Sequence, residues 1–314
     1  MKWERWGTLI LVLSQLLSPA TGRAAASSTV DPSQLDLQLK ADAAGLDWPL
    51  KVTNNDTTPQ AFTLSTVDFT ASDQYGTLNF LDASSTDLQR KFGLANWLTF
   101  DQNQIVVPGG QTVNVNVHVR NDDKLSPGAH YAAILVTRGT AAALPGESPL
   151  RAVVGSLVFL MKDGEVHPGL NLTKFDQASD WWNKPQVKLT FENTGNSFII
   201  PRGYLTVTDP RGQEVLRGLI NENSDRILPG ASREFPVNLE STGSSWLPGR
   251  YKLTVSYRYD GQDTYQTKEI IIYKSLTTLI GAGIILLFVV LLIGWFLWRH
   301  RHWSKLSKRR KASK

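Results

Sequence analysis

The chain has 314 residues, and its 33 Lys and Arg against 28 Asp and Glu give a formal net charge of +5. It contains no cysteine, which excludes disulfides and thiolate metal sites. The surplus of positive charge comes from residues 299–314, which hold eight Lys or Arg and no acid. The remaining chain has no basic stripe of the kind that nucleic-acid binding needs, so we exclude nucleic acid as a partner.

Residues 1–26 have the pattern of a secretory signal peptide. Lys2 and Arg5 precede an apolar run over residues 6–17, and three alanines at positions 24–26 form a signal-peptidase site. We predict cleavage after Ala26. The alternative is an uncleaved signal anchor, for which the apolar run is short. An exported chain without cysteine also favours a bacterial source.

The chain after residue 27 is typical of a β protein. Leu35, Leu37 and Leu39 alternate with polar residues, and a longer alternation covers residues 112–119. The run 152–161 is almost wholly apolar and is predicted as the last strand of a first domain. The one stretch in this region that allows a short helix is 87–94.

An internal repeat predicts two domains of the same kind. Asn54 and Asn193 each follow an early strand. Two Pro-Gly turns follow at the same spacing in both copies: Pro108-Gly109 and Pro127-Gly128, then Pro229-Gly230 and Pro248-Gly249. The predicted fold is all-β, with two immunoglobulin-like β-sandwich domains followed by one transmembrane helix. The first domain covers 27–165, with an insertion near 69–97, and the second covers 166–274.

The C-terminal region predicts a membrane anchor. Residues 276–298 carry no charge and would reach roughly 34 Å as a helix, against about 30 Å for a hydrocarbon core. We therefore predict a transmembrane helix over 275–298, anchored by Leu276, Trp295 and Trp298. The basic tail 299–314 places the C-terminus in the cytoplasm and the two domains outside the cell, as in a single-pass protein of the cell membrane. The tail either sets topology and touches anionic lipid or docks a cytoplasmic partner.

Motifs that carry catalysis are absent from the sequence. His118, His130 and His167 have no metal-ligand spacing, and no nucleophile elbow, P-loop or dinucleotide fingerprint occurs. The acidic clusters at 82–87 and 121–123 lack the oxygen spacing of a Ca²⁺ loop and are typical of solvated turns. We expect no enzyme activity, no metal and no cofactor.

Aromatic residues are the better candidates for ligand contact. Trp181 and Trp182 are adjacent, so on an extended strand only one of them can face the core. We name Tyr75, Trp97, Trp181, Trp182 and Trp246 as candidate ligand-binding residues. Packing in a core or between the domains is the alternative for the tryptophans.

Several motifs of the first domain resemble the bacterial WxL-interacting proteins. Asn96-Trp97 is followed by a Pro-Gly turn within 105–109, an alternating strand over 112–119 and the segment 125–134, LSPGAHYAAI. The resemblance implies a peptidoglycan-binding first domain and a second domain that binds host or surface proteins. It also implies WxL-domain proteins as partners.

Together these patterns predict a bacterial cell-surface adhesion protein. The leading hypothesis is a membrane-anchored binding protein that recognises peptidoglycan or a cell-surface protein through its β-sandwich domains, with lipid contacts from the helix and basic tail. The alternative is a non-adhesive single-pass subunit of a membrane-associated assembly, in which the helix and the tail carry the interaction. Either way, free strand edges of the sandwiches offer a route to pairing with another protein's strand.

Overall fold

A computed structural model describes residues 28–82, 84–139, 153–177, 185–243, 247–274 and 277–311. The described chain divides into two compact units. Unit 1 contains residues 28–69 and 80–164, and unit 2 contains residues 70–79 and 165–311. The predicted signal peptide, residues 1–26, lies outside the described residues.

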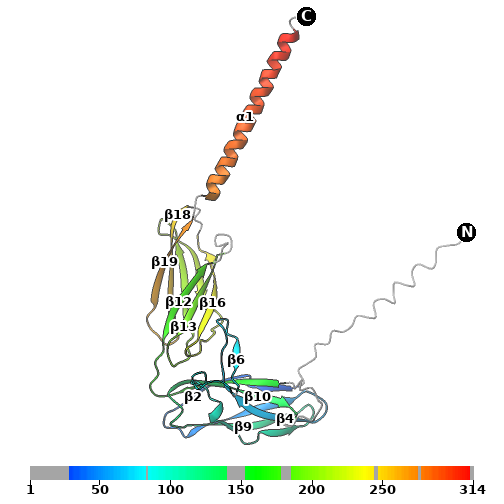
Figure 1. The fold of residues 1–314 in the computed structure, drawn as a ribbon, viewed down its shortest axis with the longest axis vertical. Coiled ribbons are helices and arrows are strands. Elements are labelled where there is room, and N and C mark those ends of the chain that lie inside the picture. Colours follow the sequence, from blue (N-terminus) through cyan, green and yellow to red (C-terminus); the bar gives the residue numbers. More distant parts are fainter. Residues whose placement is uncertain are drawn as a thin grey trace, which may run out of the picture. The chain divides into compact units, whose positions relative to one another are not determined.

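Unit 1 is a sandwich of two sheets. One sheet has the order β1 (Ser28–Asp31), β3 (Gly45–Asn54), β9 (Thr112–Arg120), β7 (Leu98–Phe100). The other has the order β2 (Gln34–Leu39), β11 (Val153–Lys162), β10 (Gly128–Arg138), β4 (Gln60–Val67), β8 (Gln104–Val107), and Figure 1 labels several of these strands. All pairs are antiparallel except β2 with β11, which is parallel.

The core of unit 1 follows from the period-2 pattern of its strands. In β9 the alternating Val115, Val117 and Val119 are buried, and the polar residues between them face outward. Burial of one such side chain contributes about 1.5–3 kcal/mol. Residues 87–94 form turns, and only a 3₁₀ turn, η1 (Ala95–Trp97), follows them, so the helix allowed there by the sequence is not formed.

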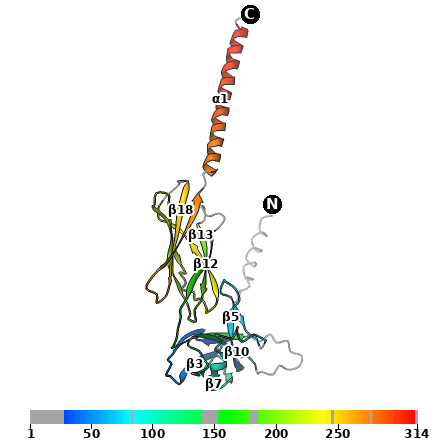
Figure 2. The same cartoon turned by 60° about the vertical axis from the view of Figure 1, so that its left-hand side comes forward.

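Unit 2 is also a sandwich. Its sheets have the orders β12 (Leu170–Gln177), β13 (Gln186–Asn193), β16 (Ser232–Asn238), and β17 (Glu240–Ser241), β15 (Glu214–Ile220), β14 (Pro201–Thr208), β18 (Gly249–Tyr259), β19 (Gln266–Lys274), several of which Figure 2 labels. Side chains from both sheets form one hydrophobic core. The all-β class and the sandwich sheets were predicted correctly, and they precede one C-terminal helix.

Asn54 and Asn193 occupy equivalent positions in the two units. The Asn54 side-chain amide donates to the carbonyl oxygens of Thr58, at 2.8 Å, and Val107, at 3.0 Å. Asn193 repeats this arrangement with Ser197, at 2.7 Å, and Ile227, at 3.0 Å. Both asparagines are fully buried, so each side chain ties together backbone groups of two segments in the interior of its unit.

Each asparagine contacts the first Pro-Gly turn of its unit. The two turns differ by one residue from the alignment that the sequence repeat predicts. The N–H of Gly110 donates to Asn54 O, whereas in unit 2 the N–H of Gly230 donates to Asn193 O. Both glycines have positive φ, 68° and 72°. Gly110, rather than Gly109, is therefore the counterpart of Gly230, and the Pro-Gly pairs differ in register by one residue.

The stretch between β4 and β8 contains the short strands β5 (Phe69–Ala71) and β6 (Leu78–Phe80) as well as η1. The corresponding connection in unit 2, between β14 and β15, is a tight turn in which the N–H of Asp209 donates to Gln213 O. Residues 70–79 of this hairpin belong to unit 2, where Gln74 O accepts a hydrogen bond from the N–H of Glu234 on β16, at 2.6 Å. The hairpin therefore covers part of the outer edge of β16.

The C-terminal helix is α1 (Thr277–Lys311). Within the described ranges, no helix combines the length and apolarity required to cross a membrane. The predicted transmembrane helix 275–298, the single-pass topology and the cell-membrane localisation are therefore wrong.

The same finding corrects the predicted function. Both versions of that prediction, the membrane-anchored protein that recognises peptidoglycan and the single-pass assembly subunit, depended on a membrane-spanning helix. Of the predicted anchor residues, Leu276 lies outside the described residues, and Trp295 and Trp298 are 52% and 64% exposed on α1.

Candidate functional site: an open strand edge

Among the described residues, strand β11 is paired along its whole length on one side only. Its inner neighbour β10 pairs with every residue from Val153 to Lys162. Its outer neighbour β2 begins later, with Leu157 opposite Gln34. In the described part of unit 1, no strand pairs with the outer edge of residues 153–156.

The gap arises because the N-terminal chain changes sheets. β1 pairs with β3 in one sheet, and after Pro32 and Ser33 the chain enters the other sheet as β2. Two hydrogen bonds mark where pairing with β11 starts: Ser156 Oγ donates to Pro32 O, at 2.6 Å, and the N–H of Leu157 donates to Ser33 O, at 2.9 Å. These two hydrogen bonds therefore define where the open segment, residues 153–156, ends along β11.

The backbone groups at this edge point outward. The N–H of Leu157 faces β2, and alternate residues of a strand direct their backbone groups to the same side. The N–H and C=O groups of Val153 and Gly155 therefore point to the open side. Val153 is 51% exposed, and Gly155 is exposed as well. These groups are available to an added strand.

The open segment lacks the features that usually protect sheet edges. Residues 153–156, Val-Val-Gly-Ser, include no charge and no proline. By contrast, the edge strand β16 contains Pro236 and is covered at Glu234 by the hairpin, and β19 presents Lys268 and Glu269. The short edge strand β8 is also uncharged and exposes Val106, so it is an alternative edge for strand addition.

The predicted aromatic residues are distributed over different parts of the fold. Tyr75 is 62% exposed in the turn between β5 and β6, in unit 2. Trp97 is half-buried on η1 and packs against the core of unit 1, with its ring 6.4 Å from that of His130. Trp181, Trp182 and Trp246 lie outside the described residues. A binding role for these five residues stays a prediction.

Behind β10, unit 1 contains a cluster of buried polar groups. The Asp68 carboxylate accepts hydrogen bonds from the N–H groups of Leu94, at 2.9 Å, and Ala95, at 2.8 Å, and pairs with Arg90 at 3.2 Å. Burial, with a further contribution from Asp68, raises the pKa of Tyr131 above its ordinary range. The carboxylate thus fixes the turn that leads into η1, which is a structural task.

His130 predicts a pH dependence of stability. Burial lowers the pKa of His130 below 6.5, and its Nε2 donates to Ser126 O at 2.8 Å. Since the unfolded chain binds the proton more readily, the free energy of unfolding should fall as the pH drops below about 6.5 and stay constant above it as far as this group is concerned. Urea unfolding of wild type and His130→Gln between about pH 5 and 8 checks this. Parallel curves for the two proteins would contradict it.

Metal and Ca²⁺ binding find no support in the described ranges, where no group of three His, Asp or Glu is placed to hold an ion. The acidic clusters form turns instead: Asp82 accepts from the N–H of Ser84 at 2.9 Å, and Asp122 accepts from the N–H of Lys124 at 2.9 Å.

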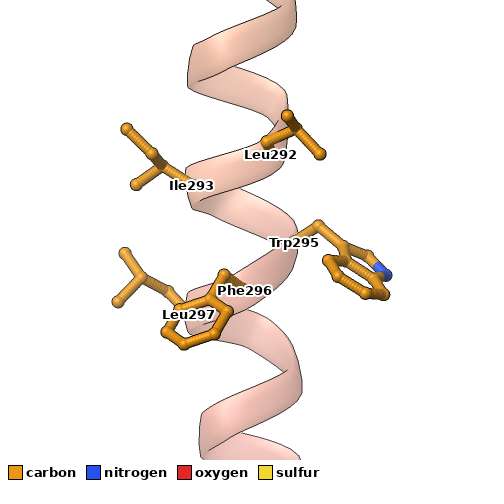
Figure 3. A pocket seen from close by; sticks show the side chains of 5 residues that line it. All are labelled: Leu292, Ile293, Trp295, Phe296 and Leu297. Carbon is orange, nitrogen blue, oxygen red and sulfur yellow. The ribbon is translucent and has the colours of Figure 1, made fainter.

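On α1, Figure 3 shows five apolar side chains, from Leu292 to Leu297, that stand out from a single helix and line a shallow hollow.

Neither a family model nor a curated protein matches the sequence. Among solved structures, the chain is similar to a chaperone–tip adhesin complex of CFA/I fimbriae biogenesis, with 12% identity over 79% of this chain and 99% of that chain and a TM-score of 0.43. It is also similar to the class 5 fimbriae chaperone CfaA, with 11% identity, 79% and 99% coverage and a TM-score of 0.39. A third similar structure is the Salmonella enterica SafA pilin in complex with the SafB chaperone, with 11% identity, 79% and 97% coverage and a TM-score of 0.38. At these identities and TM-scores the likenesses carry no conclusion about what this chain binds.

Proposed function

We propose that this chain is a protein-binding module in which unit 1 captures an extended segment of a partner by strand addition at the open edge of β11. The observation that carries the proposal is the outer edge of residues 153–156, which no strand of the described residues pairs with, and where Val153 and Gly155 direct their backbone groups outward. An extended peptide supplies the complementary row of N–H and C=O groups.

The energetics indicate what the bound segment must contain. Two outward residues offer four backbone groups, and each hydrogen bond contributes about 0.5–1.5 kcal/mol net, so the main chain supplies about 2–6 kcal/mol. Micromolar affinity needs about 8 kcal/mol. The partner segment should therefore also bury apolar side chains against the exposed Val153.

The resemblance to WxL-interacting proteins suggests a first partner to test. In that family the partners are WxL-domain proteins, so a WxL-domain protein from the source organism is our first candidate. An extended peptide selected from a displayed library is the second probe, because strand addition reads backbone geometry as well as side chains.

Gly155→Pro tests the site against a matched control. Proline removes the outward N–H and is tolerated at the open side of an edge strand, so binding of either probe should weaken at least about tenfold. Gly155→Ala keeps the N–H, and its Cβ would lie 3.5 Å from Ile134 O, an ordinary contact, so its affinity should stay within about twofold of wild type. Fluorescence anisotropy on the full chain measures both.

Val106→Pro separates β11 from β8, a second uncharged edge of the same sheet. The N–H of Leu64 donates to Asn103 O, so by alternation the backbone groups of Val106 point away from β4. The proposal requires Val106→Pro to leave binding unchanged. If Val106→Pro abolishes binding and Gly155→Pro does not, the site is on β8 and the proposal fails.

A further inference from the structure

A row of alternating arginines and tyrosines lies on the outer face of the larger sheet of unit 2. We name it the Arg-Tyr row; it comprises Arg217 on β15, Tyr204 on β14, Tyr265 just before β19, and Arg258 on β18. In β14 the neighbouring Leu205 and Val207 are buried in the core, so Tyr204 faces the other way. The row therefore faces away from the core, and it belongs to unit 2, whereas β11 belongs to unit 1.

The members of the row contact one another in sequence. The guanidinium of Arg217 lies 5.5 Å from the ring centre of Tyr204, the two tyrosine rings are 5.8 Å apart, and the guanidinium of Arg258 lies 5.1 Å from the ring centre of Tyr265. Each cation–π contact is weakly favourable at an exposed position. These contacts hold long side chains in place before a partner arrives, which reduces the entropy lost on binding.

The charge of the row is only partly neutralised. Arg217 pairs with Glu214 at 3.2 Å. Arg258 donates from Nη1 to Gln262 O at 2.5 Å. Among the described residues, no carboxylate lies within ion-pair distance of the Arg258 guanidinium. The Nε of Arg258 is buried and has no hydrogen-bond partner among the described residues. The row therefore presents an uncompensated positive charge.

Exposed apolar surface adjoins this charge. Tyr265 is 47% exposed, and Leu219, which lies directly opposite Tyr204 on β15, is 57% exposed. Tyrosine and arginine are enriched in the centres of protein–protein interfaces, and a planar guanidinium binds a carboxylate through two parallel hydrogen bonds. This combination fits an acidic peptide that also carries apolar side chains.

We propose that the Arg-Tyr row is a second docking surface, which binds an acidic segment of a protein partner by placing an Asp or Glu carboxylate on Arg258 and an apolar side chain over Tyr265 and Leu219. The site is independent of strand addition at β11. Its partner segment is recognised by charge and by aromatic contact, whereas the β11 edge recognises an extended backbone.

The test uses the full chain carrying Gly155→Pro, so that strand addition at β11 does not contribute. A displayed library of random peptides of about 12 residues is selected on this protein, and the selected peptides are measured on two further variants. Arg258→Gln should weaken them at least about tenfold. Arg250→Gln removes an equal charge from the same face of the same strand, about 26 Å away at about 3.3 Å per residue, and should leave their affinity unchanged.

The proposal also predicts that the selected peptides are enriched in Asp and Glu and bind at least about threefold more weakly when salt is raised from about 50 to about 300 mM. If Arg258→Gln unfolds with the same midpoint temperature as wild type, the variant is folded and the loss of binding is not due to unfolding. Peptides that lack acidic residues, or that bind Arg258→Gln as well as wild type, would overturn the proposal. The proposal would also fail if Arg258→Gln reduced retention of the protein on heparin but changed the binding of no peptide. The ligand of the row would then be an anionic polysaccharide.

Discussion

Replacing Asn193 with alanine is expected to lower the free energy of unfolding of unit 2 by about 3–5 kcal/mol. The side chain is fully buried, donates to Ser197 O and Ile227 O, and accepts from the N–H of Gly195 at 3.0 Å. Alanine leaves Ser197 O and the N–H of Gly195 without this partner, at about 1–3 kcal/mol each when water cannot reach them, whereas Ile227 O keeps its hydrogen bond from the N–H of Ile199. Hydrogen exchange of the amides in β13 and β18 reports the stability of unit 2 by itself.

The control for this prediction is Asn223→Ala. Asn223 is exposed in the neighbouring loop, and its replacement should change the free energy of unfolding by less than about 0.5 kcal/mol. Asn54→Ala should destabilise unit 1 as strongly as Asn193→Ala destabilises unit 2, because the two side chains make equivalent hydrogen bonds. If either alanine variant lowers the free energy of unfolding of its unit by less than about 1 kcal/mol, the hydrogen bonds of the buried side chain do not stabilise that unit as proposed.

Replacing Asp68 with alanine is expected to destabilise unit 1 by about 3–5 kcal/mol. The carboxylate is 3% exposed, and its loss leaves two backbone N–H groups and the Arg90 guanidinium without their acceptor. Hydrogen bonds to a charged acceptor contribute about 1.5–3 kcal/mol each. Urea unfolding followed by hydrogen exchange in β10 measures the change.

Two variants bracket this second prediction. Asp68→Asn keeps an acceptor oxygen for the backbone N–H groups and should lose about half as much as the alanine variant. Asp73→Ala removes an exposed carboxylate that also accepts backbone hydrogen bonds, and it should destabilise the protein far less than Asp68→Ala, because water can replace the lost acceptor. Equal losses in Asp68→Ala and Asp73→Ala would contradict the role assigned to the buried carboxylate.

Local pattern was sufficient to predict much of the fold. The alternation over 112–119 becomes β9 with its valines buried, and the asparagines at 54 and 193 that suggested a repeat make matching hydrogen bonds. Both signals are local, because a strand's pattern and a turn's chemistry depend on residues close in sequence. The one-residue offset of the Pro-Gly pairs was not predictable, since it follows from which glycine N–H reaches the asparagine carbonyl.

The candidate site could not be located from the sequence. Residues 153–156 belong to an apolar run that predicts a strand but does not show which of its sides is covered. That depends on where the N-terminal chain changes sheets at Pro32 and Ser33, more than a hundred positions away. The pairing of residues 70–79 with β16 is also a contact between distant segments. The Arg-Tyr row was missed for the same reason, because its members come from three different strands and from the residue before a fourth.

The most direct test of strand addition is amide hydrogen exchange of the full chain, alone and with a bound peptide or WxL-domain protein. We expect the N–H groups of Val153 and Gly155 to exchange freely in the unbound chain and to become protected on binding, while the N–H of Val106 on β8 is unaffected. Protection that appears elsewhere, with Val153 and Gly155 still exchanging freely in the complex, would contradict it.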